Sequence, residues 1–576
     1  MIQRVVHLVV RRGRLYVHRT MEWLLLALAG LGVWAGHEST SALAALLAWA
    51  FAAACFIYAC KLEGRWLKAH RLPIFGSRGL PVHELTRVQR KTGRITPDFV
   101  GAEWRSLWDL WYRHRWHRTS RWLSRPGNIR LGLSSPEQRL FGVIGPRQLG
   151  FTPPRHVVLL APTRAGKGTM GLVPNLLTLP NSALVVDPKG ELARITAARR
   201  GGGQAQFPKS RVTESMGQEV HVFDPFDTTQ GMQNATFNPL DELDENDPAV
   251  VTLAGAIARA LVLGDATGAD VTFQDRAREL IQAVILHVIT VEDPSRRSLP
   301  HVWNFLVSGD VEYLQYLQHE AQQQNVTLSI TTPIEALFAC MSANTAFNGL
   351  VAGAGSEMLQ LVPETRDGIL FYARRELGFL KDPQMQRAIS SSTFRLRDIF
   401  DKRMTIYLCL PVMKVVGEQR RIMSMFLTLL MDLLESVHEP AEHPYLIIDE
   451  FPALGHFEPL EKAMGLVKYR FTVWAVFQDI GQMKKLYKEA WETFISNSSI
   501  IALRVANPET ANWLSNLLGQ VIGPSGTVPL IAPHELLGRF SDDEDRRILF
   551  LEGVPAILQG TPYMEMFPTT LYDHVV

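Results

Sequence analysis

Six short apolar runs, rich in β-branched residues, limit the fold of this chain more than any other feature. They are HVVLLA from 156, ALVVD at 183–187, MTIYLCL at 404–410, YLIID at 445–449, TVWAVF at 472–477 and IIALRV at 500–505. Runs without polar alternation are typical of parallel strands buried on both faces, and helical patterns lie between them. The sequence therefore predicts an α/β fold with a mostly parallel, doubly wound sheet.

A long stretch between the second and third runs has no comparable strand signal. Apolar residues recur there at the helical spacing of three, four and seven, namely Ala277, Leu280, Ile281, Val284, Ile285 and Val288. An inserted all-α domain is therefore expected, whereas GGGQAQ at 201–206 is typical of a flexible loop.

Composition narrows the class of protein. With 47% hydrophobic and 20% charged residues, the chain has the composition of an ordinary globular protein and not that of a disordered or collagen-like one. Its 59 basic and 57 acidic residues nearly cancel to +2, which gives no whole-molecule reason for a polyanionic partner. The four cysteines lack C-x-x-C spacing, so neither a zinc site nor a disulfide scaffold is expected.

The N-terminal region predicts a membrane hairpin. An arginine-rich segment, 1–20, precedes apolar runs at 23–36 and 42–60, and basic residues follow the second run. At 1.5 Å per residue the second run reaches about 28 Å, close to the hydrocarbon thickness of a bilayer. A cleaved signal peptide does not account for the second run, and buried helices of a soluble domain are the other alternative. Two transmembrane helices with both ends in the cytoplasm fit best.

The segment from Trp104 to Arg130 interleaves arginines with tryptophans. This pattern suits either stacking on nucleic-acid bases or an anionic lipid surface, and we favour the lipid or a structural role because of its place in the chain.

A candidate phosphate-binding loop follows the first apolar run. It reads Ala161-Pro-Thr163-Arg164-Ala165-Gly166-Lys167-Gly168-Thr169. Such a loop presents backbone N–H groups to phosphate oxygens, and its lysine reaches the β and γ phosphates. Two positions depart from G-x-x-x-x-G-K-[ST], because Ala161 replaces the first glycine and Gly168 occupies the place of the Mg²⁺-binding hydroxyl. Thr169 is a candidate substitute, and the hydroxyl assignment stays open.

A second element strengthens the case for a nucleotide site. The run YLIID ends in Asp449 and Glu450. In a nucleotide-hydrolysing site these acids would hold Mg²⁺ and activate the attacking water, respectively. The alternative is an ordinary strand with an acidic end. Because Lys167 and Asp449 are far apart in sequence, one nucleotide domain requires an insertion between its halves, which the helical stretch supplies.

From about 155 to 560 the chain resembles the coupling-protein ATPases of type IV secretion and conjugation, which are membrane-anchored RecA-like motors. The motifs that carry the resemblance are APTRAGKGT (161–169), PNLLTLP (174–180), DPKGE (187–191), VFDPFD (222–227), FNPLDELD (237–244), IIDEFPALG (447–455), FQDIGQMKKLY (477–487) and VANPETANWLSNLLG (505–519).

The resemblance implies roles for particular residues. Lys167 and the loop would bind ATP, Asp449 would serve Mg²⁺, and Glu450 would act on water, while the hydroxyl ligand of Mg²⁺ stays open with Thr169 as its candidate. Gln478 resembles a γ-phosphate sensor, or it caps a strand end; Asp187 either shapes the site or forms a turn. An arginine finger from a neighbouring subunit is implied as well. Its candidates are Arg374, Arg375, Arg397 and Arg504.

The resemblance also implies a multi-pass protein of the bacterial inner membrane, with most of the chain cytoplasmic. It would form a homo-hexamer that drives relaxase-bound DNA from the relaxosome into a type IV secretion channel. A protein-effector receptor without DNA transport and a non-hydrolysing nucleotide-binding scaffold remain the alternatives. The expected division of the chain is 1–71 basic segment and transmembrane helices, 72–150 Trp-rich juxtamembrane segment, 151–265 first half of the nucleotide domain, 266–400 all-α domain, 401–540 second half, and 541–576 C-terminal tail.

Overall fold

The structure is a computed structural model. It describes most of the chain from His156 onward, together with a few short segments before it. The described residues are 47–52, 100–101, 117–118, 129–134, 148–151, and 156–574 without 264–269, 412–419, 437–441, 466–470, 524–525, 540–545 and 552.

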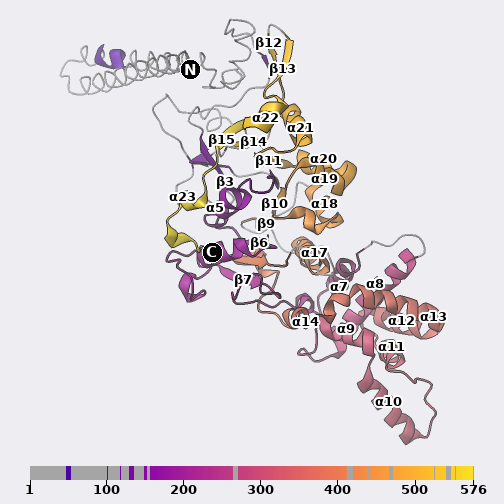
Figure 1. The fold of residues 1–576 in the computed structure, drawn as a ribbon. Coiled ribbons are helices and arrows are strands. Elements are labelled where there is room, and N and C mark those ends of the chain that lie inside the picture. The colour runs from indigo at the N-terminus through magenta and orange to yellow at the C-terminus, as the bar shows by residue number, and fades with distance from the viewer. Residues whose placement is uncertain are drawn as a thin grey trace.

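A twelve-stranded sheet forms the centre of the described chain (Figure 1). Its order is β2-β4-β3-β15-β14-β11-β5-β10-β9-β6-β8-β7. The strands from β11 to β7 run parallel, and the strands from β14 to β2 extend the sheet in antiparallel fashion. The strand bounds are β2 His117–Arg118, β3 Ile129–Ser134, β4 Gln148–Phe151, β5 His156–Leu160, β6 Ala183–Val186, β7 Glu219–Phe223, β8 Met404–Leu408, β9 Tyr445–Ile448, β10 Thr472–Phe477, β11 Ser498–Leu503, β14 Arg546–Leu551 and β15 Val554–Gln559.

All six predicted runs form strands of the parallel part, namely β5, β6, β8, β9, β10 and β11. Their side chains are almost completely buried, as expected for strands covered on both faces. A mostly parallel central sheet with helices is therefore confirmed. A separate small sheet has the order β1-β12-β13. Its strands are β1 Val100–Gly101, β12 Gln520–Gly523 and β13 Gly526–Pro529.

The helices that accompany the sheet come before and after a long helical segment in the sequence. A π-helical turn, Lys167–Leu172, follows β5 and continues directly into α5. The other bounds are α5 Val173–Leu176, α6 Glu191–Arg200, α7 Val250–Leu261, α15 Asp398–Asp401, α17 Arg420–Ser436, α18 Glu458–Gly465, α19 Ile480–Tyr487, α20 Trp491–Ser496, α21 Pro508–Leu518, α22 Pro533–Arg539 and α23 Tyr563–Met566, with 3-10 turns at Gly203–Ala205, Pro239–Glu242, Phe451–Leu454, Lys488–Ala490 and Thr569–Leu571.

Between β7 and β8 the described residues form helices and no strand, and α8 to α13 stand away from the sheet (Figure 1). Polar caps define several of these helices. Thr332 and Glu335 form a reciprocal capping box at the start of α11, and Ser298 and Asp310 cap α9 and α10. The bounds are α8 Asp270–Val291, α9 Leu299–Ser308, α10 Val311–Gln324, α11 Pro333–Ala343, α12 Ala346–Gln360, α13 Pro363–Glu376 and α14 Pro383–Ala388, with a 3-10 turn at Gly378–Lys381.

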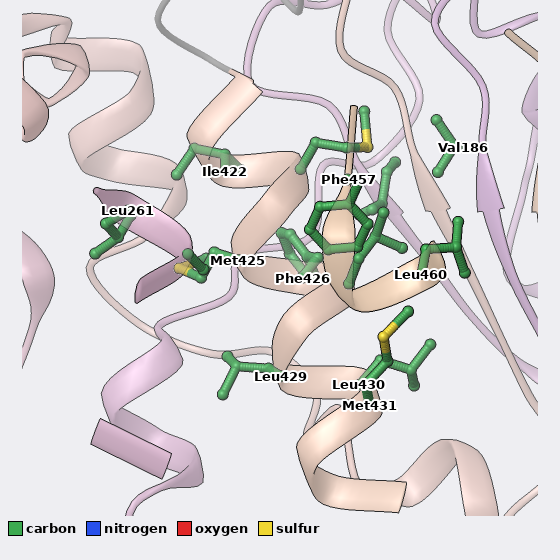
Figure 2. Packing of buried hydrophobic residues seen from close by; sticks show 14 of the residues in the cluster. Val186, Leu261, Ile422, Met425, Phe426, Leu429, Leu430, Met431, Phe457 and Leu460 are labelled. Atoms are coloured by element: carbon green, nitrogen blue, oxygen red, sulfur yellow. The ribbon is translucent and has the colours of Figure 1, made fainter. Parts of the chain in front are cut away.

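Helix α17 joins the helical segment to the sheet. Its residues Met425, Phe426 and Leu430 are buried in one cluster with Val186 of β6 and Leu261 of α7 (Figure 2). Phe426 also packs edge-on against Phe223 of β7, with ring centroids 5.1 Å apart. Because each such side chain contributes about 1.5–3 kcal/mol when fully buried, α17 fixes α7 on the sheet face.

The predicted localisation, a multi-pass protein of the bacterial inner membrane, is corrected by the structure. Crossing a bilayer takes about 20 consecutive apolar residues in one helix. No helix in the described part of the chain combines that length with that apolarity, and the 22-residue helix α8 carries charges such as Asp275, Arg276 and Glu279 in its first half. The predicted spans at 23–36 and 42–60 lie outside the described residues, apart from 47–52. The part of the chain that the structure describes therefore contains no transmembrane hairpin.

Two regions differ from the sequence-based expectation. Within 541–576, expected as a tail, β14 and β15 form a hairpin that pairs with β11 and lengthens the sheet. The segment 201–206 is not an open loop, since Gly201 and Gly203 are buried and Gln206 Nε2 donates to Val220 O at 2.8 Å. Both differences come from long-range pairing, which local sequence does not encode.

Candidate functional site

The turn after β5 has the backbone that a phosphate loop needs. Ala161 continues the sheet, because its N–H donates to Phe477 O at 2.8 Å, so this position needs no glycine. Gly166 has a left-handed φ of 78°, and a Cβ there would also meet the flexible end of the Met170 side chain. Arg164 also takes a positive φ of 63°. The backbone therefore favours the second glycine of the motif and does not need the first.

The amides after Gly166 begin a helix. Met170 N–H donates to Gly166 O at 2.8 Å, so the amides of Lys167, Gly168 and Thr169 precede the helical hydrogen-bond ladder. A Cβ at Gly168 would meet no atom within 4 Å, so this face of the loop is open. Thr163 and Arg164 are exposed and Ala165 is buried. This arrangement can receive an anion on backbone N–H groups at a helix start.

Lys167 meets both acids at the end of β9. Its Nζ lies 3.0 Å from Glu450 Oε2 and 3.3 Å from Asp449 Oδ1, and it donates to Asp449 O at 3.1 Å. The order β5-β10-β9 places a single strand between the lysine loop and the acidic strand end. Residues that the sequence separates by a long insertion therefore share one site.

Burial and charge compete in this cluster. Burial alone would lower the pKa of Lys167, but the charges of Asp449 and Glu450 outweigh it and raise the pKa. Burial raises the pKa of Asp449, while the Lys167 ammonium acts in the opposite direction. Burial and the Lys167 ammonium thus act in opposite directions on the pKa of Asp449, and burial is the larger effect.

Gln478 directly follows β10 and contacts the same cluster. Its Nε2 donates to Glu450 Oε1 at 3.2 Å, so the two oxygens of Glu450 face Gln478 and Lys167. The backbone N–H of Gln478 donates to Gln482 Oε1 at 3.0 Å. The cap of the strand end is therefore supplied by Gln482, a residue that the sequence analysis missed, and the Gln478 side chain points to Glu450.

Asp187 lies at the end of β6 and is completely buried. Its Oδ2 accepts the N–H of Ala193 at 2.8 Å and so caps the start of α6, while Gly190 N–H closes a turn onto Asp187 O at 3.0 Å. Burial, with the charge of Asp449 nearby, raises the pKa of Asp187 to about 7. Asp187 thus forms a turn and caps a helix beside the acidic pair.

The donor set fits a nucleotide with Mg²⁺. Asp449 Oδ1 is buried and has no hydrogen-bond partner among the described residues, although Lys167 lies at ion-pair distance. Thr169 Oγ1 makes only a 3.5 Å contact with Gly166 O. In the described part of the chain no group of three or more His, Cys, Asp or Glu side chains could hold a metal. Magnesium, which is commonly held by one or two carboxylates together with phosphate oxygens, suits such a site.

The four candidate arginines occupy different environments. Arg397 Nε donates to buried Glu242 at 3.0 Å, Arg374 Nε donates to Leu306 O at 2.7 Å, and Arg375 pairs with Glu376. Only Arg504 among them lines the pocket of about 250 Å³ that Thr163 and Gln478 also line. Arg504 belongs to the same chain as the loop that it approaches, and its Nη1 lies 3.5 Å from Arg164 O.

A further contact to the loop helix was missed by the sequence analysis. Buried Arg547 of β14 donates from Nη2 to Met170 O. No local signal identifies this residue, because it lies in a segment expected to be a tail. The contact ties the antiparallel extension of the sheet to the helix that carries Lys167.

Fold and site together define a class of α/β proteins in which a loop lysine after one parallel strand meets an acidic pair at the end of another. The fold resembles that of the plasmid coupling protein TrwB in complex with ADP and Mg²⁺, with a TM-score of 0.52, 16% identity, and 81% of this chain and 96% of that chain covered. This likeness shows the fold alone.

The family follows from the sequence. Residues 118–522 match the family described as "Type IV secretory system Conjugative DNA transfer", and the chain belongs to it. It is 27% identical over 391 residues to the conjugal transfer protein TraG of Escherichia coli, covering 64% of this chain and 55% of TraG. It is 26% identical over 428 residues to VirD4 of Agrobacterium fabrum, covering 70% of this chain and 57% of VirD4. The chain thus spans just over half the length of these curated relatives.

Proposed function

We propose that this chain is an ATP-hydrolysing coupling protein that drives relaxase-bound DNA into a type IV secretion channel. The observation that carries the proposal is the convergence of Lys167, Asp449, Glu450 and Gln478 at one edge of a RecA-like sheet. Family membership supports conjugative DNA transfer as the process that the site powers.

The roles of the site residues follow from their chemistry. Residues 163–169 would cradle the phosphates, and Lys167 would move from the acidic pair to the β and γ phosphates when ATP binds. Glu450 would accept the proton of the attacking water, and Gln478, which holds the other oxygen of Glu450, would report the γ-phosphate. Asp187 would position the acidic pair through α6.

Asp449, with Thr169 as a candidate second ligand, would hold Mg²⁺. The metal, when bound, neutralises charge on the phosphate oxygens. The buried Asp449 Oδ1 supports this role, because Lys167 is its ion-pair partner in the structure, and a cation would have to replace that ammonium when the lysine turns to the phosphates.

The proposal extends to assembly and partners. From the family we infer a homo-hexameric ring, a relaxase or effector protein as the cargo, and channel components as partners. The division of the chain at 151–265, 266–400 and 401–540 belongs to the same proposal, with the helical segment meeting the relaxosome.

The test is ATP turnover by the full-length chain with and without DNA across a salt series, with oligomer mass measured in the same sample. We expect DNA to stimulate turnover at low salt and the stimulation to fall as salt rises, because phosphate contacts release counterions. No stimulation at any salt, with intact basal turnover, would favour the protein-effector receptor; the net charge of +2 makes this a real alternative. Nucleotide binding without turnover would favour the non-hydrolysing scaffold.

A further inference from the structure

A second, larger cavity lies away from the phosphate loop. It has a volume of about 720 Å³ and is lined by Arg194 and Ala198 of α6, residues 206–211, residues 230–233, and Asp573 and His574. The C-terminal end of the described chain lies beside the β6 and β7 side of the sheet (Figure 1). No residue of the loop at 161–169 and none of the acidic pair lines it. Its size is in the range of small-molecule pockets, about 300–1,000 Å³.

The charges of the lining favour an anion. Arg194, Lys209 and Arg211 face a single carboxylate, that of Asp573. Asp573 Oδ1 already accepts the backbone N–H of Arg211 at 2.8 Å, so this carboxylate is partly engaged. The pocket therefore carries excess positive charge although the whole chain is nearly neutral.

Arg194 is the residue best placed to hold the anion. Arg194 lines the cavity, and its Nη1 makes a solvent-exposed 3.3 Å contact with Gln230 Oε1. The planar fork of a guanidinium matches the oxygens of phosphate or carboxylate. An oxyanion in the cavity would be a further acceptor for this exposed side of the guanidinium.

The remaining lining suits a flat ring with polar edges. Phe207 and Met232 are half-buried and pack against the second hydrophobic core, so each is held in place while presenting a face to the cavity. The exposed amides of Gln230 and Gln233 lie on the same rim. Aromatic faces stack on nucleobases whatever the base, and amides bond the base edges.

The walls are ordered by hydrogen bonds of their own. Phe207 N–H donates to Gly203 O at 2.8 Å, and Gly231 N–H donates to Asp227 Oδ1 at 2.6 Å. Asp227 and Gln230 hold positive φ angles of 55° and 60°. The pocket is thus built from fixed turns, which reduces the ordering that binding would require.

We propose that this cavity is a second ligand site that binds a nucleoside phosphate, with the phosphate on Arg194 and the base against Phe207 and Met232. The source is either a free mononucleotide or the terminal nucleotide of a DNA strand. The proposal goes beyond the function proposed above and does not depend on ATP hydrolysis at Lys167.

The test uses full-length protein carrying Lys167→Ala, so that binding at the loop is suppressed. Binding of dAMP, of a short 5′-phosphorylated oligonucleotide and of inorganic phosphate is measured by calorimetry, with and without Arg194→Gln or Phe207→Leu. We expect Arg194→Gln to weaken dAMP binding by about tenfold or more, the loss typical of one charge-assisted contact. We expect a smaller loss for Phe207→Leu and no change for the control Arg403→Gln, an exposed residue outside the cavity.

Each outcome decides a different point. Tighter binding of the oligonucleotide than of dAMP identifies a strand end as the source, and equal or weaker binding identifies the free nucleotide. Inorganic phosphate that binds as well as dAMP would overturn the nucleoside part. No dAMP or oligonucleotide binding up to about 1 mM, or binding that Arg194→Gln leaves unchanged, would overturn the proposal. Circular dichroism of each variant, together with ATP turnover of Arg194→Gln in the chain with Lys167 intact, separates loss of the site from misfolding and from failure of the ATPase.

Discussion

Lys167 Nζ donates a hydrogen bond of 3.0 Å to Glu450 Oε2 across 283 positions of sequence. The pair exists because β5 and β9 flank β10, so that the loop after one strand meets the end of another. A bound triphosphate would compete with the two carboxylates for the lysine.

Replacing this lysine tests the phosphate role. In Lys167→Ala the ammonium is lost and two neighbouring carboxylates remain without it. We expect nucleotide affinity to fall and ATP turnover to drop by at least about 100-fold, the scale for loss of one charged transition-state contact. A steady-state measurement of phosphate release tests the predicted loss of turnover. Lys402→Ala, an exposed lysine paired with Asp398, is the control and should turn over normally.

Glu450→Gln separates binding from hydrolysis. The amide retains hydrogen-bonding capacity toward Gln478 but cannot take a proton from water, so nucleotide should still bind while turnover falls by about 10²–10⁴-fold. Fluorescent-nucleotide titration and phosphate release measure the two quantities. Glu442→Gln, which precedes the same strand at its other end and pairs with exposed Arg403, is the matched control. Turnover within twofold of the parent in Glu450→Gln would refute the catalytic assignment.

Gln478 and Gln482 form a matched pair that distinguishes a sensor from a strand cap. Gln478→Ala removes the contact to Glu450 and keeps the backbone N–H that Gln482 caps. We expect a turnover loss of about tenfold, as for one lost hydrogen bond in a transition state, with little change in KM. Gln482→Ala should lower thermal stability and leave kcat nearly unchanged. The reverse pattern would mean that Gln478 is only structural.

Arg397 is expected to stabilise the fold and not to act as an arginine finger. It donates from Nε to Glu242 Oε2 at 3.0 Å and from Nη2 to Glu242 O at 2.9 Å, and the Glu242 side chain is fully buried. Arg397→Ala leaves a buried carboxylate without its partner, so unfolding free energy should fall by about 3–5 kcal/mol in denaturant titrations. Arg403→Ala breaks an exposed pair and should cost at most about 1 kcal/mol. A stable Arg397→Ala chain that lost only turnover would reverse this view.

His287 should make the helical segment sensitive to acid. It is buried in α8, its Nδ1 accepts a 3.2 Å hydrogen bond from Asn344 Nδ2, and burial lowers its pKa from 6.5 to about 4. Between these values the unfolded chain binds a proton that the folded chain does not, so stability is complete above pH 6.5 and is lost as pH falls toward 4.

The size of this effect is roughly 3 kcal/mol, from 1.36 kcal/mol per pKa unit. Hydrogen exchange of α8 peptides at several pH values checks it. His287→Gln should show a flatter pH dependence than the parent, and the exposed His319→Gln should not. An unchanged slope in His287→Gln would contradict the assignment.

The sequence predicted those parts of the fold that are locally encoded. Strands buried on both faces are continuous apolar runs, so β5, β6, β8, β9, β10 and β11 were found. The edge strand β7, EVHVF, alternates and was missed, and so was the antiparallel hairpin at 546–559. Those strands depend on partners far along the chain.

The site was predictable in its residue types and not in its contacts. Gly166 and Lys167 are recognisable from loop chemistry, because a left-handed turn and an ammonium are local requirements. That Gln482 caps the strand end, and that Arg547 holds Met170 O, follow from strand order and helix packing alone. Neither the spacing nor the residue types encode those contacts.

The parallel pairing of β7 with β8 determines where the helical segment joins the sheet. Parallel strands start at the same end, so the chain between Phe223 and Met404 is one crossover that leaves at the C-terminal end of β7 and returns to the N-terminal end of β8. Its length and surface can change while the register of the two strands stays the same. Insertions within this crossover can therefore alter its surface while the neighbouring strands β9, β10 and β5, which carry the site, keep their order.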